Sequence, residues 1–98
     1  MTENRFRSVL SDLEAECLSL GAAFGKQNRL WLMRAEAVRA ARSGKATKAQ
    51  VAVLREYREQ EARLMMMMRE AAGTEREFLA ANREAGAALE EAIRRFER

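Results

Sequence analysis

The sequence predicts an all-α protein, an antiparallel helical hairpin of the coiled-coil kind. Its 98 residues include no proline, 34% of them are charged and 48% are hydrophobic, which is typical of long helices and coiled coils. Apolar residues recur in alternating steps of four and three, the 3.5-residue repeat of a left-handed coiled coil. The helical pattern stops and restarts at residues 43–47. A chain of this length is one small domain, over residues 1–98.

The first helix is expected over residues 3–42, because one apolar seam runs through most of it. Gly21 and Gly25 weaken this helix, each by about 1 kcal/mol relative to alanine. They indicate either a close helix crossing, which we favour, or a kink. The seam consists of Phe6, Leu10, Leu13, Cys17, Leu20, Phe24, Trp31 and Val38, with Gln27 and Arg34 as polar members. A second apolar stripe beside it consists of Leu30, Met33 and Ala37.

The turn at residues 43–47 separates the first helix from the second. Gly44 can take the left-handed conformation that ends a helix, because it has no Cβ to clash. Thr47 and Gln50 have the spacing of a capping box. In this motif the threonine hydroxyl accepts from a free N–H of the new helix, and the glutamine reaches back to the threonine N–H. A new helix is therefore expected to begin at residue 48 and to fold back along the first.

The second helix is expected over residues 48–97, where the same repeat continues. Gly73 can stop a helix, and Thr74 with Glu77 has the spacing of a second capping box. Two architectures stay open: a hairpin of two long helices, or three helices with a short third one that starts after a break near 73–74. The seam of this segment consists of Leu54, Tyr57, Glu61, Leu64, Met68, Ala71, Glu75, Phe78, Asn82, Ala85, Leu89, Ala92 and Phe96.

A continuous second helix would be roughly 75 Å long, against roughly 60 Å for the first. The part of the second helix that extends beyond the first would leave several large apolar side chains uncovered. Such side chains do not stay in water when a partner is available. This architecture therefore predicts a protein partner, either another protein or a second copy in a homodimer or higher oligomer.

Five consecutive apolar residues, from Leu64 to Met68, are the most unusual local feature. Successive helical positions rotate by about 100°, so these five cover the whole circumference and one hairpin partner cannot bury them all. Methionine is flexible and recurs on surfaces that accept varied apolar ligands. The alternative is a helix enclosed on several sides by a bundle or dimer. The candidate partner-binding surface consists of Leu64, Met65, Met66, Met67, Met68, Phe78, Leu89, Ile93 and Phe96.

An enzymatic function is not expected. The chain has no histidine, so the commonest general base is missing and metal sites of the Glu-x-x-His type cannot be built. Cys17 lies in the apolar seam, where a thiol behaves as a small hydrophobe. The Ser43-Gly44-Lys45 segment lacks the spacing of a phosphate-binding loop. We therefore expect no catalytic residue, no metal and no cofactor.

Charge is unevenly distributed along the chain. Residues 26–58 carry a net charge of +7, whereas residues 1–25 and residues 59–98 carry −2 each. In a hairpin the central block lies at the turn, and it would form a basic tip that suits an acidic protein surface, a nucleic acid or an anionic membrane. Nucleic acid is the less expected, because no recognised binding motif is present. The basic tip consists of Arg34, Arg39, Arg42, Lys45, Lys48 and Arg55.

Two segments of the sequence resemble the small coiled-coil proteins of flagellar and type III export. They are Arg5-Phe6-Arg7 with Val9-Leu10 near the start, and Asn82 through Ala87-Ala88-Leu89-Glu90 to Arg94-Arg95-Phe96 near the end. The similar proteins are the export chaperones and the stalk protein of the export ATPase, which are antiparallel helical hairpins. The resemblance implies a cytoplasmic adaptor that binds an export ATPase or an amphipathic substrate helix.

The expected function is therefore that of an adaptor or chaperone that binds a partner protein through an apolar helix face. The alternatives are a nucleic-acid-binding or phage-assembly factor that uses the basic tip, and a purely structural self-assembling bundle. A cytoplasmic location is expected, because a single cysteine suits a reducing compartment and the first residues lack the apolar stretch of a secretory signal. No apolar run is long enough to span a bilayer.

Overall fold

Helices account for most of the residues that the structure describes. The computed structural model describes residues 1–23, 25–71 and 76–97, and for residues 62–71 and 76–82 it describes the backbone alone. Within these ranges the chain forms four α-helices and one turn of 3-10 helix, and no strand. The all-α prediction is confirmed. The elements are α1 (Glu3–Ala23), η1 (Gly25–Gln27), α2 (Asn28–Arg42), α3 (Lys48–Ala71) and α4 (Arg76–Phe96).

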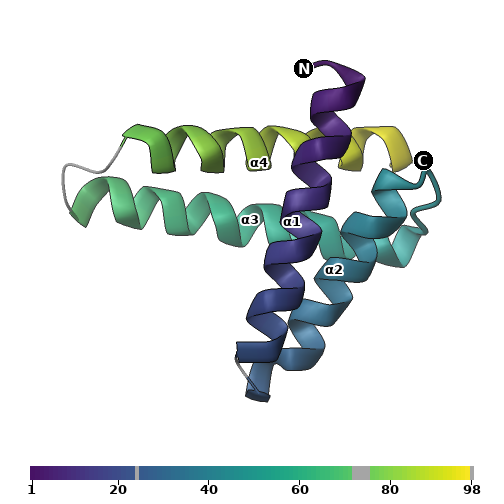
Figure 1. Ribbon diagram of the computed structural model, residues 1–98, viewed down its shortest axis with the longest axis horizontal. Coiled ribbons are helices and arrows are strands. Elements are labelled where there is room, and N and C mark those ends of the chain that lie inside the picture. Colours follow the sequence, from purple (N-terminus) through teal and green to yellow (C-terminus); the bar gives the residue numbers. More distant parts are fainter. Residues whose placement is uncertain (24, 72–75, 98) are drawn as a thin grey trace.

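The helices are arranged as two pairs (Figure 1). In the first pair α1 and α2 lie side by side and run in opposite directions, and α3 and α4 do the same in the second. The first pair lies across the second, and α2 contacts both of its helices. The longest dimension of the molecule is 39 Å, far shorter than the rod of roughly 75 Å that one long hairpin would form. The single antiparallel hairpin is therefore not confirmed.

The predicted helix over residues 3–42 is divided into α1 and α2. The chain reverses through η1, and Gly21 lies where the two helices approach each other. A Cβ built on Gly21 would lie 3.4 Å from the Cβ of Trp31 and 3.5 Å from the side-chain oxygen of Asn28, which are ordinary contact distances, so the two helices approach each other here without requiring glycine. The apolar seam predicted for one long helix is therefore shared between α1 and α2. Its buried residues on the two helices pack into the same core: Phe6, Leu10, Leu13, Cys17 and Val38.

The turn at residues 43–47 has the predicted geometry. Gly44 has a φ of +77°, and the N–H of Lys45 donates to the carbonyl oxygen of Ala40 at 2.9 Å, which satisfies a carbonyl at the end of α2. The capping box is also present. The N–H of Thr47 donates to Oε1 of Gln50 at 3.0 Å, and the N–H of Gln50 donates to Oγ1 of Thr47 at 3.2 Å.

The predicted helix over residues 48–97 is represented by α3 and α4. Residues 72–75, which include the break expected near 73–74, lie outside the described residues, and so does the second capping box of Thr74 and Glu77. On either side of them the two helices are antiparallel (Figure 1). The architecture with a helix that folds back after α3 is therefore the one that agrees with the structure, although this helix is 21 residues long rather than short.

The core lies where the two helix pairs cross, and all four helices contribute to it. On α4 the contributors include two alanines whose small side chains allow the neighbouring helices to approach. The buried core residues are Phe6, Val9, Leu10, Leu13, Cys17, Ala35, Ala37, Val38, Ala41, Leu54, Tyr57, Ala88, Leu89 and Ala92. At the edge of the core the guanidinium of Arg95 lies 4.0 Å from the ring centre of Phe6 and pairs with Glu3 at 2.7 Å, which ties α4 to the start of α1.

Candidate functional site

The predicted partner-binding surface is only partly described, and its described members are packed within the protein. Leu89 has no exposed surface and belongs to the core, while Ile93 and Phe96 are half-buried and pack against it. These three residues are therefore not an uncovered stripe, because the folding back of α4 brings them onto the core. The side chains of Leu64, Met65, Met66, Met67, Met68 and Phe78 lie outside the described residues.

The six residues of the predicted basic tip do not form one charged surface. Arg34 is 3% exposed. Arg42 is half-buried and pairs with Glu14 at 2.7 Å, and Arg55 pairs with Glu97. The exposed members without an ion pair among the described residues are Arg39, Lys45 and Lys48.

Arg34 lies instead in a buried polar cluster between α2 and α3. Its guanidinium carbon is 4.7 Å from the ring centre of Trp31 and 4.9 Å from that of Tyr57, and it donates a hydrogen bond to Oε1 of Gln60. The two aromatic rings meet edge to face, with centres 6.1 Å apart. Contacts of this kind stabilise a cation that has left water. Arg34 therefore joins the two helix pairs and is not available at the surface.

Cys17 of α1 contacts this cluster through Tyr57, and the side chains of both residues are buried. The thiol donates to the tyrosine hydroxyl at 3.5 Å. Burial raises the pKa of the Cys17 thiol, and burial together with the hydrogen bond from Cys17 raises the pKa of Tyr57. Both groups therefore stay protonated at neutral pH. A nucleophilic cysteine needs the opposite shift, so the geometry favours the structural interpretation of Cys17.

The outer face of the first helix pair carries a groove that the sequence did not predict. Leu18 of α1 and Leu32 of α2 flank it with 47% and 42% of their surfaces exposed, and Ala35, which is 3% exposed, is a buried part of its lining. The volume of the groove is about 210 Å³. Its remaining lining residues are Glu14, Glu36 and Arg39.

Leu18 and Leu32 lie outside both predicted apolar stripes. In the sequence each directly follows a seam residue, Cys17 and Trp31, and so points away from the core side of its helix. The signal that could have found them is a large apolar residue off the seam on each of two helices. Only the pairing of α1 with α2 shows that these two residues lie beside the same groove.

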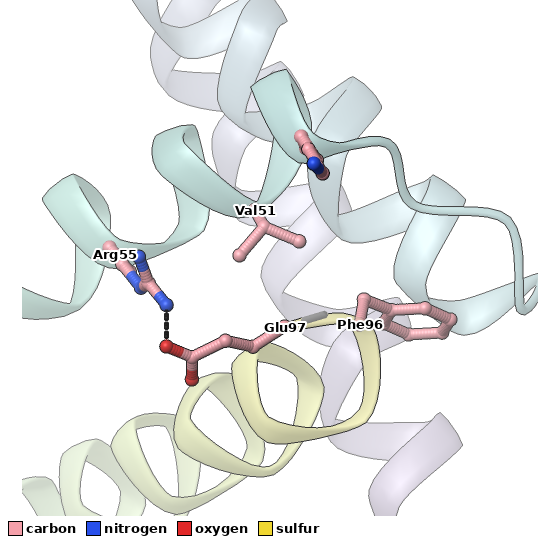
Figure 2. A pocket seen from close by; sticks show the side chains of 5 residues that line it. Val51, Arg55, Phe96 and Glu97 are labelled. Atoms are coloured by element: carbon pink, nitrogen blue, oxygen red, sulfur yellow. Dashed lines mark hydrogen bonds and ion pairs between the residues drawn. The ribbon is translucent and has the colours of Figure 1, made fainter.

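A second hollow lies where α3 begins and α4 ends (Figure 2). Its volume is about 360 Å³. Figure 2 shows Arg55 of α3 and Glu97, the residue that follows α4, joined by an ion pair beside Val51. The hollow is lined by Lys48, Val51, Arg55, Phe96 and Glu97.

Comparisons with protein-family models, curated proteins and solved structures found no match for this chain. The resemblance to export proteins therefore stays a prediction. Among the described residues, no group of three or more acidic, cysteine or histidine side chains is placed to hold a metal ion. None of the described helices combines the length and apolar character needed to cross a bilayer. The structure is that of a small all-α protein with a groove on its first helix pair, lined by both apolar and charged residues.

Proposed function

We propose that this protein is a non-enzymatic helical adaptor, and that it binds an amphipathic helix of a partner protein in the groove between α1 and α2. The observation that carries the proposal is the pair of exposed leucines, Leu18 of α1 and Leu32 of α2, which line one groove together with buried Ala35. Exposed apolar side chains on two neighbouring helices suit the apolar face of a third helix, which is a recurrent mode of peptide recognition. With this addition the first helix pair would become a three-helix unit.

The charges on the groove indicate the chemistry of the partner helix. Glu14 is engaged by Arg42, but Glu36 and Arg39 are exposed and have no ion-pair partner among the described residues. They lie three residues apart on α2, on neighbouring positions of one helix face. A partner helix with two apolar residues one turn apart, flanked by one basic and one acidic residue, would complement the groove in both shape and charge.

The basic tip gives less support to a nucleic-acid-binding or phage-assembly function. Arg34 is buried, and Arg42 and Arg55 are held by carboxylates, so three of the six predicted residues are already engaged. An adaptor in flagellar or type III export remains the particular setting that the resemblance suggests. In that setting the partner helix would belong to an export ATPase or to an exported substrate.

The proposal is tested by selecting a displayed library of amphipathic helical peptides on the wild-type protein, with the Leu18→Glu variant as counter-target. Enriched peptides should share apolar residues at helical spacing and should bind Leu18→Glu at least about tenfold more weakly, the loss typical of a central interface residue. Met33→Glu is the matched control, because Met33 is 44% exposed on α2 but does not line the groove. Circular dichroism should show that both variants keep the wild-type helix content.

Two results would contradict the proposal. One is enrichment of peptides that bind wild-type and Leu18→Glu equally well. The other is a wild-type homodimer, measured by light scattering at several concentrations, that Leu18→Glu converts to a monomer. In that case a second copy of the chain would cover the groove, and the purely structural self-assembling alternative would replace the adaptor.

A further inference from the structure

The hollow between the start of α3 and the end of α4 combines an apolar surface with two cationic side chains. Val51 is 4% exposed and Phe96 is half-buried, so the apolar part of the lining comes mainly from Phe96, and most of the exposed lining is polar. Lys48 and Arg55 are exposed. With Val51 they follow a spacing of three and four residues, so all three lie on one face of α3.

The ion pair at this hollow shows which chemical group its cationic side can hold. The carboxylate of Glu97 binds the guanidinium of Arg55. Lys48 is not engaged by a carboxylate among the described residues, and the charged residues that line the hollow sum to one positive charge. A second carboxylate could therefore be accepted by Lys48, and could compete with Glu97 for Arg55. The volume of about 360 Å³ is at the small end of the range for ligand pockets.

We propose that this hollow binds a carboxylate carried on a compact apolar body. The apolar body packs on Val51 and Phe96, and the carboxylate lies between Lys48 and Arg55 in place of Glu97. This chemistry has two sources, a free aryl or alkyl carboxylic acid and the C-terminus of a peptide that ends in an apolar residue. The site lies apart from the groove between α1 and α2 and does not depend on the proposed adaptor function.

The test is a titration of the isotope-labelled full chain, followed by two-dimensional NMR, with N-acetylphenylalanine as probe and N-acetylphenylalaninamide as its uncharged match. The acid should shift the signals of Val51, Arg55 and Phe96 in a saturable way, and should bind more tightly than the amide. A short peptide ending in a free phenylalanine carboxylate forms the second arm. Binding of this peptide at least several-fold tighter than the free acid would identify a peptide C-terminus as the source, and equal binding would identify the small acid.

Two variants give opposite expectations. Lys48→Gln should weaken binding of the acid by about two- to fivefold, the effect of an exposed ion pair. Glu97→Gln should strengthen it by a similar factor, because it removes the carboxylate that competes for Arg55. Both residues are exposed, so both variants should fold, which circular dichroism checks. The proposal is overturned if acid and amide bind alike, or if the two variants change the affinity in the same direction.

Discussion

Replacing Leu89 by alanine is expected to destabilise the protein far more than the same replacement at Leu18. Leu89 is fully buried in the core formed by all four helices, whereas Leu18 is 47% exposed. A fully buried leucine loses about 2–5 kcal/mol on truncation to alanine, since the lost burial is joined by the cost of a cavity. At Leu18 about half of the side chain is already in water and alanine is the better helix former, so the expected loss is less than about 1 kcal/mol.

The assay is thermal and urea unfolding of the two variants, followed by circular dichroism. In a domain of this size 1 kcal/mol shifts Tm by about 4–8 °C, so Leu89→Ala should lower Tm by roughly 8–40 °C and Leu18→Ala by less than about 8 °C. Because both variants remove the same atoms from a helix, the difference between their losses of stability measures the effect of burial. Equal losses, or a larger loss at Leu18, would refute the placement of α4 against the core and would restore the uncovered apolar stripe predicted from the sequence.

Three further predictions concern local features. Thr47→Ala should lower the unfolding free energy by about 1 kcal/mol in urea titrations, because it removes half of the reciprocal capping box, and an unchanged value would show that the box contributes nothing. The Cys17 thiol should react with Ellman's reagent at pH 8 far more slowly than free cysteine, because it is buried and its pKa is raised. Its reaction should be faster in urea, and equal rates in buffer and urea would contradict the burial. Burial and the charge of Glu16 raise the pKa of Glu61 above its usual 4.5. The native state therefore holds the Glu61 proton to higher pH than the unfolded chain does, and the protein loses stability as the pH rises. Glu61→Gln should therefore raise the unfolding free energy at pH 7 and leave it nearly unchanged at pH 3, and a loss of stability at pH 7 would reverse that assignment.

The turn at residues 43–47 could be predicted in detail because its determinants are local. Gly44 adopts the positive φ that glycine tolerates best, and Thr47 and Gln50 form hydrogen bonds across three residues. Motifs of this kind depend on residue type and spacing alone. The all-α class was predictable for a similar reason, since composition and periodicity report on helices directly.

The reversal between α1 and α2 could not be predicted in the same way. The apolar repeat keeps its register from Leu20 through Trp31, so periodicity alone continues one helix across the turn. Gln27, the residue that precedes α2, makes no side-chain capping hydrogen bond, so the capping signal present at Thr47 is missing here. Gly21 and Gly25 were the available signals, and they indicate a close crossing or a kink without specifying a reversal.

The candidate site depended on tertiary structure. The burial of Arg34 could be predicted in part, because this arginine occupies a seam position in the sequence. The groove could not be predicted from the sequence. It requires Leu18 and Leu32 to come together from two helices, whereas the apolar repeat predicted a single helix over residues 3–42. Leu89 was assigned to an exposed surface because α4 was expected to overhang, and the same side chain becomes core once α4 folds back.

The most direct test of the helix-binding account is a map of the amide signals that shift when a selected amphipathic peptide is added to the labelled protein. We predict that the shifts centre on Leu18, Leu32 and Ala35 and leave the signals of Val51 and Phe96 unchanged. Shifts that centre on α4 or on the start of α3, with the groove residues unaffected, would contradict the account and would place partner binding on another face of the protein.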